Sequence, residues 1–224
     1  MCGRLALTLP TDAMARMFQA QPANDLPDSP NYNICPTDQV PVARSGPGGR
    51  HLVGMRWGFV PHWYKSPTDG PLLINARAET LAEKPAFRDA CRQRRCLFVA
   101  SGFYEWSRQG DTRLPWYVFR RDGAPLVLGG IWQMWGQQDA QPTCAIVTTA
   151  ANQTLSAIHH RMPLVLEPED WPLWLGEEGH GAARLMRPAE EDRLDLFRVG
   201  KAVNSNRAHG PELIEELIDP EDVG

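Results

Sequence analysis

The chain has 224 residues, of which 42% are hydrophobic, and this predicts one domain with a sizeable core. Its formal net charge of −4 excludes a surface coated in positive charge for nucleic acid, although a local basic groove is compatible with it. No apolar run approaches the roughly 18 residues of a membrane span and no secretory signal is evident, so we expect a cytoplasmic protein. The cysteines include no Cys-x-x-C pair, so we expect reduced thiols and no zinc site.

The first residues, Met1-Cys2-Gly3-Arg4, suggest a reactive chain end. An initiator Met is readily removed before a small side chain, and its removal would leave Cys2 with a free α-amine beside its thiol. Both groups are partly unprotonated near neutral pH, because amines and thiols of this kind have ordinary pKa values of about 8 and about 8.5. Such an aminothiol can trap an aldehyde, since the amine forms a Schiff base and the thiol then closes a thiazolidine ring. The alternative is that Cys2 is a small apolar residue entering a strand.

Alternating apolar residues predict strands in the first half of the chain, at 3–9, 40–43 and 51–56. A Gly- and Pro-rich turn at 45–49 joins the last two as a hairpin. Thr11 or Asp12 is expected to cap a short helix after the first strand. Residues 21–38 are rich in Pro, Asn and Asp, which predicts an irregular loop.

The second half predicts more strands, at 96–100, 116–120, 126–135 and 144–150, and a strand pair over 194–203. Helices are expected at 81–95, 168–175, 181–187 and 211–218. Trp171 and Trp174 are expected to pack inward. Many short strands with few helices favour an α+β fold, which we expect to be a single domain over residues 1–224. Its core, at about 2–213, is expected to be a curved, barrel-like antiparallel sheet with a few peripheral helices.

Two motifs combine aromatic and polar residues. Trp57-Gly58-Phe59-Val60-Pro61-His62-Trp63 holds three aromatic side chains, either as core packing or as an apolar platform for a flat ligand such as a base. In Gly102-Phe103-Tyr104-Glu105-Trp106 a carboxyl group lies among three aromatic residues, and apolar surroundings penalise its ionised form. Glu105 is therefore a candidate general acid–base residue, the alternative being an outward-facing glutamate on a strand.

Positive charge gathers in two places. The denser patch consists of Arg88, Arg92, Arg94 and Arg95, for which we expect a solvated helix face. The second is His159-His160-Arg161, which is compatible with anion binding, although a lone histidine pair is more often structural or exposed.

These motifs together resemble the SOS response-associated peptidase (SRAP) family of abasic-site-linking proteins. The resemblance runs from Cys2 to about Leu213. It depends on motifs that occur in order: Met1-Cys2-Gly3-Arg4, Trp57-Gly58-Phe59-Val60-Pro61, Asn75-Ala76-Arg77-Ala78-Glu79-Thr80, Arg95-Cys96-Leu97, Gly102-Phe103-Tyr104-Glu105-Trp106 and His159-x-Arg161-Met162-Pro163. Val99 and Ser101 stand where similar proteins usually carry Pro and Asp, and we expect them to alter only a turn. His160 fills the variable position of the last motif, so its register assigns the functional role to His159.

The resemblance implies covalent capture of abasic sites in single-stranded DNA during the response to DNA damage. Cys2 would attack the aldehyde of the opened deoxyribose with its amine and then its thiol, giving a stable thiazolidine, and a lyase activity is compatible with the imine stage. Asn75 would hydrogen-bond the sugar or the α-amine. Glu105 would shuttle protons in Schiff-base formation and in reversal of the link, and His159 would protonate the ring oxygen.

The resemblance also implies DNA contacts. Arg77 and Arg161 would hold phosphates through planar forks, and Trp106 would stack on a base beside the lesion. Arg4 is a weaker candidate for a phosphate contact. We expect a monomer in the cytoplasm, associated with the nucleoid when bound to damaged DNA, with no cofactor, no metal and no membrane partner. The sequence indicates no particular partner at the replication fork.

Two other functions stay open. A cysteine peptidase would use Cys2 as nucleophile, His159 as base and Asn75 as orienting group. Such an enzyme does not need its nucleophile at the chain terminus. A non-catalytic reader of modified DNA would use the aromatic platform alone and would leave Cys2 and Glu105 without a role.

Overall fold

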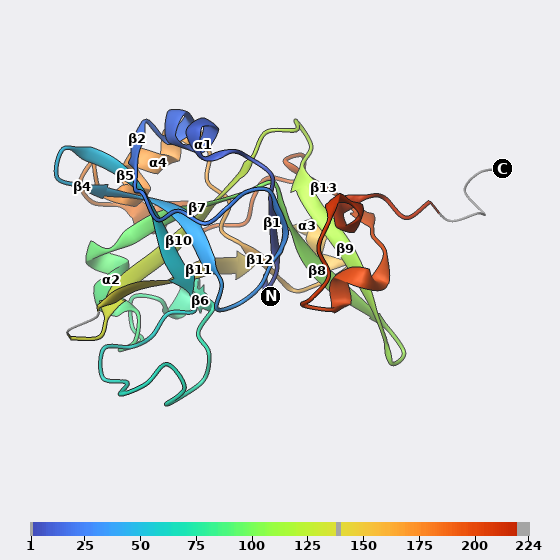
Figure 1. The fold of residues 1–224 in the computed structure, drawn as a ribbon, viewed down its shortest axis with the longest axis horizontal. Coiled ribbons are helices and arrows are strands. Elements are labelled where there is room, and N and C mark those ends of the chain that lie inside the picture. Colours follow the sequence, from blue (N-terminus) through green and yellow to red (C-terminus); the bar gives the residue numbers. More distant parts are fainter. Residues whose placement is uncertain (1, 138–139, 219–224) are drawn as a thin grey trace.

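The computed structural model describes residues 2–137 and 140–218, whose strands form two sheets (Figure 1). The smaller sheet has the strand order β13 (Leu194–Arg198), β9 (Thr112–Arg120), β8 (Gly102–Gln109), β1 (Leu5–Leu7) and β3 (Asn31–Ile34). The larger sheet has the order β12 (Arg161–Pro163), β11 (Gln141–Ala150), β10 (Leu126–Trp135), β7 (Arg95–Ala100), β4 (Gln39–Gly46), β5 (Gly49–Trp57) and β2 (Ala20–Pro22). The expected mixed α+β fold class is confirmed.

The larger sheet departs from a purely antiparallel arrangement. Strand β5 pairs in parallel with β11, so the path β11-β10-β7-β4-β5 returns to its starting strand and curves around the core. Strand β6 (Asn75–Arg77) also pairs in parallel with β11, and β2 pairs in parallel with β5. The parallel pairs were not predicted, because a short strand such as β6 carries no periodic pattern of its own.

The helices are short and peripheral. The α-helices are α1 (Thr11–Phe18), α2 (Arg88–Gln93), α3 (Gln153–Ser156) and α4 (Trp171–Leu175). The 3-10 helices are η1 (Ala78–Thr80), η2 (Pro168–Asp170), η3 (Ala182–Leu185), η4 (Lys201–Asn204) and η5 (Pro211–Ile214). Within the described part of the chain, no helix is long and apolar enough to cross a membrane.

The main core fills the larger sheet. Trp57, Phe98 and Trp174 are fully buried there, and Trp171 also packs inward as predicted. Gly130 on β10 makes room for this packing, because a Cβ at that position would collide with the Phe98 ring. Burial of these large rings is the main stabilising contribution of the core.

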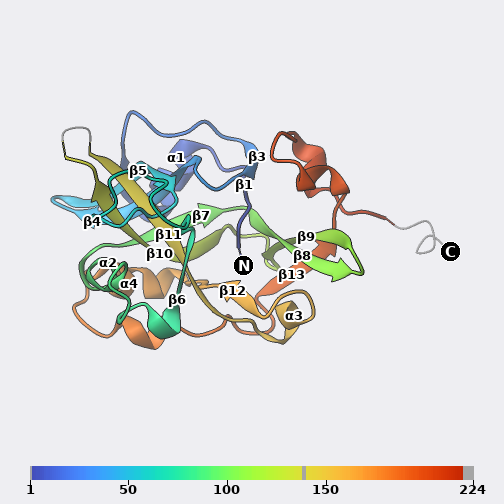
Figure 2. The same cartoon turned by 90° about the horizontal axis from the view of Figure 1, so that it is seen from below.

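A second, smaller cluster covers the outer side of the smaller sheet. It consists of Ala6, Tyr104, Tyr117, Val199, Val203 and Leu213. The segment from Val199 to Leu213 follows β13 and lies beside β8 and β9 in both views (Figures 1 and 2). This segment is called the C-terminal segment below.

Several predicted strands are confirmed. Strand β10 has the predicted bounds, and β4 and β5 form the predicted hairpin with Gly46 opposite Gly49. The strand expected at 3–9 is shorter, because only Leu5–Leu7 pairs with its neighbours. The loop expected at 21–38 is wrong in part, since β3 lies in it and pairs with β1 despite its polar sequence.

The predicted helices need more correction. The helix expected over 81–95 is reduced to α2, since Pro85 lacks the N–H that a continuous helix would use. Thr11 and Asp12 do not cap α1, which begins after Pro10, and Asp12 instead pairs with Arg16.

The end of the chain also differs from the predicted elements. The strand pair expected at 194–203 is β13 alone, followed by η4. The helix expected at 211–218 is limited to η5, because the backbone beyond it turns to bridge Val199 through Glu216.

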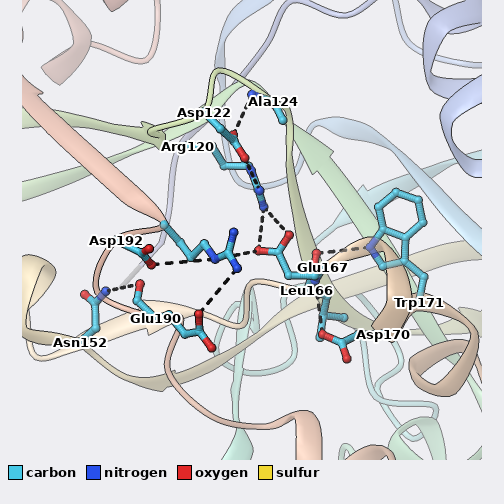
Figure 3. Close-up of polar contacts among 11 residues, drawn as sticks. Arg120, Asp122, Ala124, Asn152, Leu166, Glu167, Asp170, Trp171, Glu190 and Asp192 are labelled. Carbon is cyan, nitrogen blue, oxygen red and sulfur yellow. Dashed lines mark hydrogen bonds and ion pairs between the residues drawn. The ribbon is translucent and has the colours of Figure 1, made fainter.

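A buried arginine ties β9 to the segment before α4 (Figure 3). Arg120 donates from Nε and Nη2 to the two carboxylate oxygens of Asp122, at 3.0 and 2.6 Å. Its Nη1 donates to both oxygens of Glu167, at 2.9 and 3.0 Å, and Glu167 caps η2. The hydrogen bond from Arg120 lowers the pKa of the Asp122 carboxyl group. Arg120 thus holds two carboxylates that would otherwise repel each other.

We predict that Arg120→Leu lowers the free energy of unfolding by about 2 kcal/mol, because it leaves half-buried Glu167 without its main partner. The matched variant Arg121→Leu removes an exposed arginine paired with Asp195, and its loss should stay below about 1 kcal/mol. Pairing lowers the pKa of Asp122, so the stabilisation is present above the unfolded value of about 3.9 and is lost as the pH falls below it. Urea unfolding at pH 7 and pH 3 measures both effects, and equal losses for the two variants would contradict the prediction.

Candidate functional site

A polar pocket opens between the first residues of the chain and the smaller sheet. It is lined by Gly3, Arg4, Glu105, Trp106, Arg108, Arg113, His159 and Asn204. Four of these, Arg4, Glu105, Trp106 and His159, are residues that the sequence singled out. The structure thus brings together side chains from β8, from the chain start and from the stretch before β12.

Cys2 directly precedes Gly3 of this lining and is fully buried. Its backbone carbonyl accepts a hydrogen bond of 2.8 Å from Nδ2 of Asn75. Burial raises the pKa of the Cys2 thiol, and the negative charge of Glu105 raises it further. The thiol is therefore held in its protonated form, so attack by sulfur requires a nearby group to take its proton.

Asn75 reaches Cys2 because β6 is inserted beside β11. Asn75 lies opposite Ile146 in the parallel register, and the Ile146 N–H donates to the carbonyl of Ile74 at 3.0 Å. While Nδ2 binds the Cys2 carbonyl, Oδ1 of Asn75 is buried and has no hydrogen-bond partner among the described residues. A buried amide oxygen of this kind is an acceptor for a donor close to Cys2.

Glu105 is buried on β8, opposite Trp116 of β9. The expected alternative of an outward-facing glutamate is therefore wrong. One carboxylate oxygen accepts a hydrogen bond of 3.2 Å from the Trp106 N–H. Its charge influences both Cys2 and His159, which shows that the carboxylate lies within electrostatic reach of both. A group in this position can exchange protons with either of them.

His159 lies between α3 and β12. Its backbone N–H donates to Leu155 at 2.9 Å, and its ring stacks on His160 with centroids 4.4 Å apart. Burial lowers the pKa of His159, and the negative charge of Glu105 partly opposes this change. His159 is therefore predominantly neutral near pH 7.

Trp106 is surrounded by positive charge. The guanidinium carbon of Arg4 lies 5.8 Å from its ring centroid, and that of Arg113 lies 5.3 Å away. Its indole N–H donates to Oδ1 of Asn204 at 2.6 Å. Arg4 is fixed in turn by Asn33 and by the carbonyl of Val203, at 2.5 and 2.9 Å. An aromatic face bordered by two guanidinium groups suits an anionic ligand with a flat part.

The remaining predicted residues lie outside the lining of the pocket. Arg77 is exposed on β6, two residues after Asn75. Arg161 is buried, and its guanidinium group binds Glu79 and the carbonyl of Thr148. A phosphate contact by either arginine stays a prediction, and that of Arg161 would have to share its planar fork with Glu79.

Sequence reasoning missed Arg108, Arg113 and Asn204. The two arginines are direct cross-strand partners on the β8–β9 hairpin. Gly110 is a turn signal that could have revealed them, because counting outward from a turn there pairs these positions. Like charges directly opposite each other destabilise a sheet, so their placement beside the pocket favours a role in anion binding. Asn204 comes from the C-terminal segment, and no local signal indicated that it reaches Trp106.

The other sequence candidates lie elsewhere. In the aromatic motif, Trp57 and Phe59 belong to the core, whereas Trp63 is 49% exposed. Among the four clustered arginines, Arg92 is exposed as expected, but Arg95 turns inward and donates to the carbonyl of Cys91 at 2.7 Å. Within residues 2–137 and 140–218, no group of three or more His, Cys, Asp or Glu side chains is arranged to hold a metal ion.

The chain is similar to a known protein family and to several of its members. The family model described as "SOS response associated peptidase (SRAP)" matches residues 1–206. The abasic site processing protein YoqW of Bacillus subtilis is 33% identical over 224 residues, which cover 96% of this chain and 99% of the relative. The abasic site processing protein YedK of Escherichia coli is 32% identical, covering 97% of this chain and 100% of the relative.

A more distant relative and a solved structure are also similar to this chain over most of its length. The abasic site processing protein HMCES of Xenopus tropicalis is 27% identical and covers 97% of this chain and 79% of its own length. An X-ray structure of a protein from Bacteroides thetaiotaomicron shares the fold with a TM-score of 0.85 and 24% identity, over 97% of this chain and 100% of that one. The family model over most of the chain, together with relatives 33% and 32% identical over nearly their full length, shows that the protein belongs to the SOS response associated peptidase (SRAP) family.

Proposed function

We propose that this protein captures abasic sites in single-stranded DNA through a covalent thiazolidine on Cys2, after removal of Met1. The observation that carries the proposal is the hydrogen bond from Asn75 to the Cys2 carbonyl, beside a pocket that Glu105 and His159 line. The relatives named abasic site processing proteins support the choice of an abasic site as substrate. An abasic deoxyribose opens to an aldehyde, which is the group that an aminothiol traps.

The chemistry proceeds in two bond-forming steps. The α-amine of Cys2 adds to the aldehyde carbon, and loss of water from the adduct gives an imine. The thiol then adds to the imine carbon, a carbon–sulfur bond forms, and the thiol proton passes to the nitrogen, which closes the ring. No oxidant or reductant is needed, because the carbon remains at the aldehyde oxidation level throughout.

The residues around Cys2 would have different roles in these steps. Oδ1 of Asn75 is an acceptor that would hold an N–H of the α-amine, which orients its lone pair toward the aldehyde. Glu105 would donate a proton to the departing water and accept the thiol proton, which matters because burial keeps that thiol protonated. His159 would donate to the sugar oxygen as the ring of the deoxyribose opens.

The positive border of the pocket would hold the DNA strand. Arg4, Arg108 and Arg113 lie around Trp106, and phosphates beside the lesion are the anions that they would bind. Arg77 would add a phosphate contact beyond Asn75. The phosphate contact predicted for Arg161 would be to the same DNA strand. Trp106 would stack on a neighbouring base if one guanidinium group moves from its face. A charge concentrated here is compatible with the net charge of −4, because the contacts span only a few nucleotides.

The peptidase alternative fits the geometry less well. In a Cys-His-Asn arrangement the asparagine orients the imidazole. Here Nδ2 of Asn75 binds the Cys2 carbonyl, while Nδ1 of His159 is held by the backbone of Arg161. The reader alternative is weakened because Trp57 and Phe59 of the proposed platform are buried in the core.

The central prediction concerns the chain end. Processed wild-type protein should give a heat-stable adduct with a single strand that contains one abasic site, seen by denaturing gel electrophoresis. Cys2→Ala keeps the amine but not the thiol, so it should give only an imine that borohydride traps. Inserting an alanine between Met1 and Cys2 keeps the thiol but moves the free amine, so no thiazolidine should form.

Intact-mass analysis must show that Met1 is absent from the wild-type protein, and circular dichroism must show that all three proteins are folded. A heat-stable adduct in the inserted variant would refute the proposal, since sulfur alone would then suffice. Cleavage of a peptide by that variant would instead support a peptidase, which does not need a free α-amine.

A further prediction concerns the DNA contacts. Arg77→Gln and Arg113→Gln should each weaken binding to single strands regardless of sequence and reduce the salt slope by roughly 0.7, because each loses one phosphate contact. Arg121→Gln is the matched control, since Arg121 is exposed at the far end of β9. Fluorescence anisotropy with undamaged single strands at several salt concentrations measures the slope, because a strand without an aldehyde cannot be linked. Unchanged slopes in both test variants would place the DNA elsewhere.

A further inference from the structure

Glu79 and Arg161 form a two-pronged ion pair at the edge of the site. Nη1 of Arg161 donates to one carboxylate oxygen at 2.6 Å, and Nη2 donates to the other at 2.9 Å. Nη2 also donates to the carbonyl of Thr148 at 2.6 Å, on the strand next to β12. The hydrogen bond from Arg161 lowers the pKa of Glu79, so the carboxylate is ionised at neutral pH. The planar guanidinium group of Arg161 donates these three hydrogen bonds, which leave its side chain little conformational freedom.

The backbone of the same arginine holds the imidazole of His159. The Arg161 N–H lies 3.0 Å from Nδ1 of His159, and the Arg161 carbonyl oxygen lies 3.2 Å from the same nitrogen. A peptide N–H can only donate, so Nδ1 must accept, and neutral His159 carries its proton on Nε2. If His159 becomes charged, Nδ1 gains a proton that can be donated to the Arg161 carbonyl. One residue therefore serves the ring in both protonation states.

Glu79 belongs to the segment that also positions Cys2. Strand β6 carries Asn75 to the Cys2 carbonyl, and η1 follows it directly with Glu79. The parallel pairing with β11 sets Arg77 opposite Thr148, which is the residue whose carbonyl binds Arg161. One short segment thus binds Cys2 through Asn75 at one end and Arg161 through Glu79 at the other.

We infer that Glu79 is a positioning residue: through Arg161 it fixes the peptide that keeps His159 in its Nε2–H tautomer. This inference rests on the proposed function for the use of that tautomer, in which Nε2–H donates to the sugar oxygen. The charged and titratable side chains that act on the charge of the ring are Glu105 on β8 and His160 beside it, and Arg4 lines the same pocket. The Arg161 peptide instead selects which ring nitrogen bears the proton.

Stability alone does not explain the pair. The Glu79 side chain is 54% exposed, and ion pairs of exposed carboxylates contribute little to stability. The Arg161 side chain is only 10% exposed, so its orientation depends on the partners that it keeps. Loss of Glu79 should therefore loosen Arg161 and the His159 ring without unfolding the protein.

The test reads the tautomer directly. Long-range ¹H–¹⁵N NMR spectra of the histidine rings are recorded for the wild type and for Glu79→Gln, and the signals of His159 are assigned by their absence in His159→Asn. Glu83→Gln makes the same substitution at an exposed carboxylate four residues away and is the matched control. Glu79→Asp keeps the charge and tests rescue. Single-turnover linking to abasic single-stranded DNA is measured for the same proteins.

We expect wild type and Glu83→Gln to show the Nε2–H pattern, and Glu79→Gln to show a mixture of the two tautomers. Linking by Glu79→Gln should be about 10-fold to 100-fold slower, since small misplacements of a reacting group have effects of this size. Glu79→Asp should recover part of both signals. An unchanged tautomer in Glu79→Gln would overturn the inference even if linking is slow. If the wild type forms no link, the proposed function fails, while the NMR comparison still decides the role of Glu79.

Discussion

The site depends on one backbone pairing, the parallel insertion of β6 beside β11. This strand has only three residues, so its position is set by β11 and by the core side chains around it. From that position Asn75 reaches the Cys2 carbonyl, and the residues that follow reach toward β12. A slip of one residue would turn Asn75 to the other face and break its hydrogen bond to the Cys2 carbonyl.

Burial is the main cause of the pKa changes at Cys2 and His159. A low-dielectric environment disfavours charge, so it raises the pKa of the thiol and lowers that of the imidazole. Both directions favour the neutral forms of the thiol and the imidazole. Glu105 is a buried carboxylic side chain whose charge acts on both groups, and the proposed mechanism uses it to move protons. The surrounding arginines lie further out, where they can attract an anion without charging the inner wall.

Sequence patterns predicted those parts of the fold that depend on local order. Alternating residues identified β10 and the β4–β5 hairpin, because a half-buried strand repeats every two residues. Motif chemistry singled out Cys2, Glu105 and His159, which meet around one pocket. Three contacts were not predicted: the pairing of β6 with β11, the ion pair of Arg161 with Glu79, and the hydrogen bond of Trp106 to Asn204. Each of these joins segments far apart in the chain, and no local pattern records such a contact.

The C-terminal segment has a consequence for how the protein comes into being. Arg4 binds the carbonyl of Val203, which is 199 residues away in the sequence, and Asn204 meets Trp106 at the rim. Contacts of such long range form late, because a large loop must close before they are gained. A chain emerging from the ribosome therefore exposes its first residues long before the rest of the pocket exists. The pocket is complete only when the C-terminal segment has packed, so during synthesis the proposed nucleophile, Cys2, has no completed site around it.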